Sequence, residues 1–373
     1  MIKVVLLTSQ IAPFQLELAR AMNEANLGVF YHVIFMLAEN LRPPHWLDLE
    51  DDIQSFSSIA PKNIGSKELV EWAVSRMVCI KPDVILVGGV RGNQAKAGLK
   101  YRSKVDPKVS IGMWMEPPLV ESSWFRGFIK RIDYLWRLRQ VDFVLAIGDR
   151  AYDYYIGCNV NTHFVPYGSD LSVCFALSLP KADDGRIRFL FSGGLERRHN
   201  FPVIMSSFEQ LVSLRGASFE LVISGNGPEQ AVIDSAIART PALAPLVRYD
   251  RVFDRWALRL KPFLESHVFI YPTQHAGWGL VIPEAMSAGC TIIASRFSEA
   301  ARYLVVDDVN GFFVEPTTES LLASLLRCVD DPKLVSRMGM SAREAARVCD
   351  APFVAAQLRD ALCKEIEKKG IVL

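Results

Sequence analysis

YPTQHAGWGLVIPEAM, residues 271–286, joins the end of an apolar run to a glycine-flanked loop and then to a helix that carries one acid, Glu284. A carboxylate among the apolar residues of such a helix has little structural reason to be there. It is suited to accept hydrogen bonds from two neighbouring hydroxyls, as a ribose offers, while the amides of 277–279 face a diphosphate. The segment therefore predicts a nucleotide-binding strand–loop–helix unit. The alternative is an ordinary acid on a helix surface.

Two further glycine turns lie upstream, and each follows an apolar run of strand length. GGLERRHN (193–200) carries three potential cations and is expected to open a helix, so that backbone amides and the helix dipole hold a phosphate. In GNGPE (225–229) the glycines permit positive φ, and the proline and acid suit the start of a helix. Taken alone, the first is equally compatible with a surface turn of solvated arginines, and the second with an efficient strand–helix turn.

Short Val- and Ile-rich runs alternate with longer helical patterns along the whole chain, which is typical of parallel sheets buried on both faces. In the first half we expect strands at 3–8, 29–36, 83–87, 109–113, 143–147 and 162–165. In the second half we expect them at 188–192, 220–224, 246–249, 268–271, 291–294 and 311–314. Two such runs predict two doubly wound α/β domains, each binding ligands at the carboxyl ends of its strands.

The boundary between the two domains falls in 169–185, where periodicity is lost and Pro, Asp and Gly gather. The chain of 373 residues also exceeds the roughly 250–300 at which a single core stops growing. We therefore expect an N-terminal domain over 1–170, a linker over 171–185 and a C-terminal ligand-binding domain over 186–350. A final helix within 351–373 is expected to pack back towards the N-terminal domain.

The bulk composition excludes several classes of protein. Lys plus Arg number 42 against 41 for Asp plus Glu, so the net charge favours no nucleic acid or other polyanionic partner. The seven cysteines are odd in number and never spaced as CxxC, which predicts neither a disulfide framework nor a zinc site and fits a reducing cytosol. Residues 1–8 are expected to form a buried first strand, and no apolar stretch reaches the ~20 residues that span a bilayer.

Taken in order, these elements resemble the donor-binding half of the retaining GT-B glycosyltransferases of family four, the glycosyl transferases group 1. The turn at 193–200 is similar to the family's GRLxxxKG turn, 225–228 to its GxGP turn, and 276–284 to its E-x7-E helix. VNGFFV (309–314) resembles the family's NGFLV strand, and VPYGSD (165–170) stands where the family has PNGVD. The likeness covers residues 140–360 well and the N-terminal domain weakly.

The resemblance implies a GT-B fold, in which two Rossmann-like domains face an interdomain cleft and the C-terminal domain binds a nucleotide sugar. It implies transfer of a sugar from a nucleotide-diphosphate sugar to a glycan or lipid-linked glycan, with retention and without a metal or other cofactor. Polysaccharide or lipopolysaccharide assembly is the implied setting. The residues expected to bind the donor are Gly193, Gly194, Gly225, Asn226, Gly227, His275, Gly277, Trp278, Gly279, Leu280 and Glu284.

Three positions depart from the family pattern. Aligned without gaps, the family's diphosphate-binding arginine falls on Gly194 and its lysine on His199, and the first glutamate of E-x7-E is Ala276. We expect Arg198, aided by His199, to stabilise the departing diphosphate instead. Glu284, implied to hold the ribose, is present, so nucleotide binding is better supported than any particular sugar.

In the first half, Glu116 follows an expected strand where the family has a histidine that touches the donor sugar. It is the nearest candidate for polar catalytic work, and the alternative is a solvated acid. The stretch 124–139 has five cations, one acid and a shared apolar face. It predicts either a helix lying in an anionic membrane surface or an ordinary core-facing helix with a basic outer side.

Other functions stay open on the residues alone. A GT-B nucleotide-sugar epimerase would need acid and base residues that we cannot assign, and the three departures leave room for a catalytically weak binding subunit. A dinucleotide dehydrogenase is disfavoured because neither half places GxGxxG after its first strand. The expected location is the cytoplasm, with peripheral attachment to the inner face of the membrane through 124–139.

Overall fold

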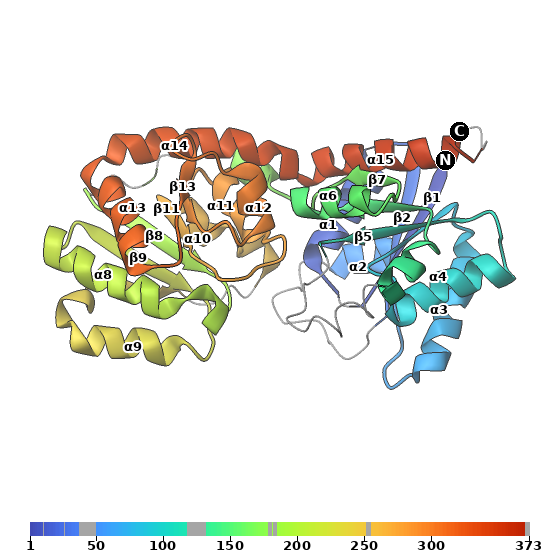
Figure 1. Cartoon of the computed structure of the whole chain (residues 1–373), viewed down its shortest axis with the longest axis horizontal. Helices are drawn as coiled ribbons and strands as arrows, with labels where there is room; N and C mark the ends of the chain where they lie inside the picture. The colour runs from blue at the N-terminus through green and yellow to red at the C-terminus, as the bar shows by residue number, and fades with distance from the viewer. Residues whose placement is uncertain are drawn as a thin grey trace. The chain divides into compact units, whose positions relative to one another are not determined.

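The computed structural model describes residues 1–9, 11–25, 27–36, 50–117, 132–177, 181, 185–250 and 255–369. The chain forms two compact units (Figure 1). The first consists of Met1–Asp170 together with the C-terminal segment that begins at Ala351, and the second is Leu171–Asp350. The chain therefore leaves the first unit once and returns to it once.

The first unit is built on a parallel sheet that has, within the described residues, seven strands in the order β3-β2-β1-β4-β5-β6-β7. The strands are β1 (Ile2–Thr8), β2 (Val29–Phe35), β3 (Ser57–Ile59), β4 (Val84–Val87), β5 (Ser110–Met115), β6 (Phe143–Ala146) and β7 (Thr162–Phe164). The helices include α1 (Pro13–Glu24), α2 (Glu50–Phe56), α3 (Ser66–Ile80), α4 (Gly92–Lys104), α6 (Asp149–Gly157) and, from the C-terminus, α15 (Ala351–Glu367). The six strands expected in this half are confirmed.

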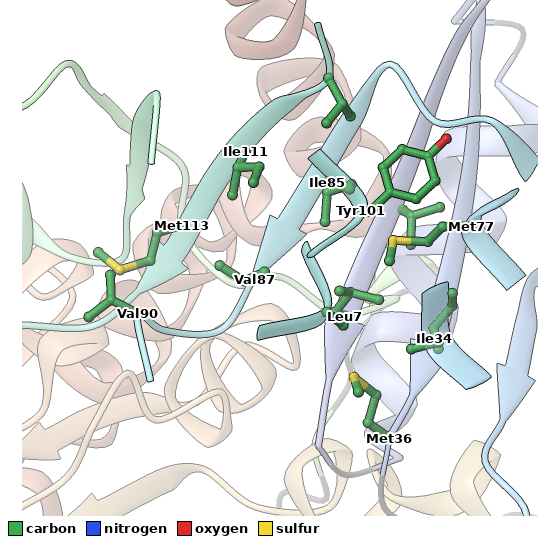
Figure 2. Packing of buried hydrophobic residues seen from close by; sticks show 14 of the residues in the cluster. Leu7, Ile34, Met36, Met77, Ile85, Val87, Val90, Tyr101, Ile111 and Met113 are labelled. Atoms are coloured by element: carbon green, nitrogen blue, oxygen red, sulfur yellow. The ribbon is translucent and has the colours of Figure 1, made fainter. Parts of the chain in front are cut away.

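Both faces of this sheet are buried. On one face Leu7 of β1 and Ile85 of β4 lie in a cluster with Met77 of α3 and Tyr101 of α4 (Figure 2). On the other face Leu6 is equally inaccessible, and α15 packs against α1. Runs of Val, Ile and Leu without polar alternation are what a parallel sheet covered on both sides requires.

The second unit carries a parallel sheet of six strands among the described residues, in the order β10-β9-β8-β11-β12-β13. The strands are β8 (Ile187–Ser192), β9 (Phe219–Ser224), β10 (Val247–Asp250), β11 (Val268–Tyr271), β12 (Thr291–Ala294) and β13 (Gly311–Phe313), all of them expected. The helices include α7 (Ser172–Ala176), η2 (Arg197–His199), α8 (Phe201–Arg215), α9 (Gln230–Arg239), η3 (Pro241–Leu243), η4 (Trp256–Leu258), α10 (Lys261–Leu264), α11 (Val281–Ser287), α12 (Glu299–Leu304), α13 (Thr318–Asp330), α14 (Pro332–Ala345) and η5 (Ala346–Cys349). The strand order reverses between β8 and β11, which is where open α/β sheets bind ligands.

The segment expected to be a linker contains helix α7. Arg343 of α14 donates through Nη2 to the carbonyl oxygens of Cys174 and Leu177, at 2.7 Å in each case. Cys174 is itself buried. These contacts attach α7 to the second unit, so residues 171–177 are a piece of that unit. Residues 178–180 and 182–184 lie outside the described part of the chain.

Glu365 anchors α15 to the edge of the first sheet. Its side chain is 5% exposed, and Oε1 lies 2.8 Å from His163 Nε2 while Oε2 accepts a hydrogen bond from Asn161 Nδ2 at 2.6 Å. Lys368 Nζ also donates to Oε1, at 2.7 Å. Burial alone would raise the pKa of this carboxyl, but the hydrogen bonds from His163, Lys368 and Asn161 outweigh it and lower the pKa to about 2.

We expect Glu365→Gln to reduce the free energy of unfolding of the first unit, because hydrogen bonds to a charged group contribute about 1.5–3 kcal/mol. The folded pKa of about 2 lies below the ordinary value of 4.5. The carboxylate therefore stabilises the wild-type fold fully above that value and loses its contribution as the pH falls towards 2. Urea titrations should show a difference between the two proteins that is smaller at pH 3 than at pH 7. Glu367→Gln, at an exposed position of the same helix, is the matched control, and equal effects of both changes would contradict the assignment.

Candidate functional site

A hollow of about 270 Å³ lies at the point where the strand order of the second sheet reverses. Its walls come from the carboxyl ends of β8 and β11 and from η2, η4, α10 and α11. It brings together five of the residues expected to bind the donor or stabilise its charge, and adds six that were not expected. The lining residues are Ser192, Gly193, Gly194, Arg198, His199, Trp256, Arg259, Phe263, Tyr271, Val281 and Glu284.

The turn after β9 supports the turn after β8 by direct backbone contact. Gly193 N–H donates to the carbonyl of Ser224 at 3.0 Å, and Leu195 N–H donates to the carbonyl of Asn226 at 2.9 Å. A Cβ at Gly225 would lie 1.9 Å from the carbonyl oxygen of Gly193. No side chain fits in that space, so the glycine at 225 is required for the approach of the two turns. Asn226 and its two glycine neighbours lie behind the lining turn, not in the lining itself.

The turn at Gly193 does not open a helix directly, which corrects the expectation from sequence. It runs into the short 3-10 helix η2 and then into Asn200, whose φ of 61° is left-handed, before α8 begins at Phe201. The dipole of α8 therefore starts several residues beyond the glycines. Arg198 is half-exposed in η2, and its Nε donates to Glu196 Oε2 at 2.6 Å. The charge of Arg198 thus lies at the rim of the hollow.

His199 is a buried group, only 2% exposed, between the rings of Phe191 and Tyr271 at centroid distances of 5.3 and 5.2 Å. Burial, together with the neighbouring Arg198, lowers its pKa to about 4. Its Nδ1 has no hydrogen-bond partner among the described residues. At neutral pH His199 therefore offers the hollow a hydrogen-bonding group and no positive charge.

The loop before α11 is held from behind by α12. The carbonyl of Trp278 accepts hydrogen bonds from Ser298 Oγ at 3.0 Å and from Ala300 N–H at 2.9 Å. Its indole is 2% exposed and packs against Tyr303. Trp278 is thus an internal packing residue that fixes the loop, whereas His275 is exposed. The remaining residues expected to touch the donor here, Gly277, Gly279 and Leu280, are half-buried.

Glu284 lies on α11 and is paired with Arg259, which sequence reasoning missed. Glu284 Oε1 is 3.1 Å from Arg259 Nε, and the Arg259 side chain is 6% exposed. The guanidinium carbon also lies 4.4 Å from the ring centre of Trp256. The signal in the sequence was a single cation between Leu258 and Leu260, since a charged residue in an apolar segment is rarely buried unless it is paired.

The candidates in the first unit are Glu116 and the stretch 124–139. Glu116 follows β5 and is half-buried, and its backbone carbonyl accepts a hydrogen bond from Tyr155 Oη at 3.2 Å. Residues 124–131 of the expected amphipathic helix lie outside the described part of the chain, and the helix is present from Ile132. Ile132 and Trp136, four residues apart, are 54% and 58% exposed. No helix in the described ranges is long and apolar enough to cross a membrane.

Residues 180–345 match the family model described as "Glycosyl transferases group 1". The match spans most of the second unit and includes every residue that lines the hollow. The second unit belongs to the glycosyl transferases group 1 family. In this group 1 domain the glycine turn, Arg198 and Glu284 line one hollow, at the point where the strand order reverses.

Comparison with individual proteins agrees with this assignment. The group 1 domain is 27% identical over 168 residues to a phosphatidyl-myo-inositol mannosyltransferase of Mycolicibacterium smegmatis, a match that covers 44% of this chain and 41% of that protein. The chain thus matches less than half the length of that relative.

Two solved structures resemble nearly the whole chain. A lipopolysaccharide outer core galactosyltransferase has a TM-score of 0.73 at 13% identity, over 98% of this chain and 100% of that one. An Anabaena protein, HepE, solved with UDP, has a TM-score of 0.71 at 15% identity, over 97% and 100%. The chain therefore has the GT-B fold of two Rossmann-like units, as expected.

We expect Gly225→Ala to destabilise the group 1 domain by about 1–3 kcal/mol or more, because the added methyl overlaps the backbone of the lining turn. Gly216→Ala is the matched control. Gly216 also has a positive φ, 59°, but an added Cβ there meets no atom within 4 Å, so the change carries a backbone cost alone. Thermal unfolding should show a larger loss for Gly225→Ala, and equal losses would mean that the two turns can separate freely.

Proposed function

We propose that this chain is a glycosyltransferase that takes a hexose from a nucleoside-diphosphate sugar and transfers it to a glycan or lipid-linked glycan. The observation that carries the proposal is the hollow between the ends of β8 and β11, where a glycine turn and the Glu284 carboxylate line the same space. Glu284 is suited to ribose hydroxyls and the backbone at Gly193 and Gly194 to the diphosphate. The group 1 match over the same residues supports this reading.

The neighbours support the class of donor and acceptor. The Anabaena protein was solved with UDP and with UDP-glucose, and the mycolicibacterial relative is named for mannosyl transfer to a lipid. The other solved neighbour is named as a galactosyltransferase of the lipopolysaccharide outer core. We therefore propose that the chain acts in the assembly of a cell-surface polysaccharide or lipopolysaccharide, on the cytoplasmic side of the membrane.

In the proposed reaction the bond between the anomeric carbon and the diphosphate oxygen breaks and a bond to the acceptor oxygen forms. The acceptor hydroxyl passes its proton to the departing diphosphate. Negative charge grows on the departing diphosphate. We assign the stabilisation of that charge to the amides of the glycine turn and to Arg198 at the rim. We further propose that transfer retains the anomeric configuration, needs no metal ion and involves a polar contact from Glu116. Transfer measured in EDTA tests the independence of metal ions, and transfer by Glu116→Gln tests the contact.

We expect one of UDP-, GDP- or ADP-hexose to raise the melting temperature, because a ligand at 100 times its dissociation constant adds ~2.7 kcal/mol to stability. Glu284→Gln should lower the affinity for that ligand about tenfold or more, since a hydrogen bond to a charged group contributes about 1.5–3 kcal/mol. Glu319→Gln, at an exposed position of α13 in the same unit, should leave the affinity unchanged. Unaltered binding by Glu284→Gln would remove this carboxylate from the donor site.

We propose that the protein meets its acceptor at an anionic membrane surface. The exposed Ile132 and Trp136 share one side of a helix because they are four residues apart, and the sequence on either side of them is basic. Such a helix can lay its apolar side into the boundary of the headgroups while its cations meet anionic lipid.

The protein should sediment with phosphatidylglycerol vesicles at low salt and not with phosphatidylcholine vesicles, since each Lys or Arg near an anionic surface contributes ~1 kcal/mol. Ile132→Ser with Trp136→Ser should reduce the bound fraction. Leu214→Ser, which changes a residue of the second unit with 54% exposure, is the control and should have no effect. A wild-type protein that ignores phosphatidylglycerol at low salt would point to a soluble acceptor.

A further inference from the structure

The two positions at which the family resemblance implies diphosphate-binding cations carry no charge here. Gly194 has no side chain, and burial keeps His199 neutral at pH 7 by lowering its pKa to about 4. Of the described residues that line the hollow, Arg198 and Arg259 are the arginines. Arg198 is half-exposed and already paired with Glu196 at the rim. A doubly charged leaving group therefore needs another source of positive charge within the hollow.

Arg259 is the cation that is built into the wall. Its side chain is 6% exposed, whereas the Arg198 side chain is 45% exposed. Glu284 holds Nε from one side at 3.1 Å, and Nη1 donates to the carbonyl oxygen of Trp256 at 3.5 Å. The ring of Trp256 lies against the guanidinium at 4.4 Å. A guanidinium presents five N–H donors in a rigid fork, so one edge can engage a carboxylate while another engages a phosphate. In a site sheltered from water such a charge acts more strongly than one at the rim.

We propose that Arg259 binds the diphosphate of the donor and takes over the charge that is missing at Gly194 and His199. This proposal rests on the proposed function, because it assigns a residue within that donor site. Glu284 has two tasks in this arrangement: it accepts from the ribose and positions the guanidinium of Arg259. Arg259 is thus a ligand-binding residue, and Trp256 is a positioning residue that restricts the guanidinium plane.

The arrangement predicts that the two members of the pair affect different parts of the nucleotide. Loss of Arg259 removes a contact to phosphate and leaves the contacts to the nucleoside. Loss of Glu284 removes a contact to ribose and also releases Arg259, so it weakens both parts. A purely structural Arg259 would affect both parts equally.

The test is calorimetry of the full-length protein with UDP, GDP and ADP, and with uridine, guanosine and adenosine; the nucleoside is measured by competition where direct binding is weak. For the base that the wild type binds, Arg259→Gln should lower the affinity for the nucleoside diphosphate about tenfold or more. It should lower the affinity for the nucleoside less than about twofold. Arg259→Lys keeps the charge and should recover part of the diphosphate affinity. Arg255→Gln, at an exposed arginine four residues away, is the matched control and should bind as the wild type does.

The salt dependence gives a second readout that does not depend on the stability of one variant. Diphosphate affinity of the wild type should fall more steeply with ionic strength than that of Arg259→Gln, and Arg259→Lys, which retains a partner for Glu284, should keep most of the steep dependence. Equal losses of diphosphate and nucleoside affinity in Arg259→Gln, or no loss in either, would overturn the assignment alone. Failure of the wild type to bind any of the three diphosphates would overturn the proposed function and this assignment together.

Discussion

The backbone of Gly225 lies against the backbone of Gly193, and the geometry of the candidate site depends on that contact. With a side chain at position 225, the carbonyl of Gly193 would have to move, because an added Cβ falls 1.9 Å from it. The two turns are joined by backbone hydrogen bonds from Gly193 to Ser224 and from Leu195 to Asn226. The lining turn is thereby held at the end of β8, next to β11, at the position where the strand order reverses. If β8 and β9 were not neighbours in the sheet, the two turns would not meet and the turn after β8 would not be held in the wall of the hollow.

The electrostatics of the hollow follow from burial as much as from the identity of its residues. A histidine at position 199 suggested a cation, but its burial between aromatic rings favours the neutral form. Arg259 and Glu284 form a buried ion pair, in which each partner offsets the desolvation cost of the other. A buried ion pair of this kind need not stabilise the fold, since apolar residues of similar volume often give a fold of equal or greater stability. The pair also lies in the wall of the hollow between the ends of β8 and β11.

The sequence predicted the strands well and the local geometry of the site less well. The twelve predicted strands are present, and most of them are runs of β-branched and other apolar residues that both faces of a parallel sheet require. The edge strands β7 (THF) and β10 (VRYD) are short and more polar. β3 was missed, since the three residues Ser57–Ile59 at a sheet edge carry no such run. Glu284 was found because an acid in an apolar helix is conspicuous. Arg259 was not, because its partner is distant in sequence and only the fold brings them together. Trp278 was expected to touch the donor, yet its ring fills the interior behind the loop, a distinction that side-chain type alone does not reveal.

The central claim is that the group 1 domain holds a nucleoside diphosphate at the switch point between β8 and β11. A crystal structure of the protein with the nucleoside diphosphate that stabilises it would test this most directly. We expect the ribose hydroxyls within hydrogen-bond distance of Glu284. The diphosphate should lie over the backbone of Gly193 and Gly194, with the guanidinium of Arg259 beside it. A nucleotide bound elsewhere, for example in the surface hollow beside Glu209 and Arg239, with the switch point empty, would contradict it.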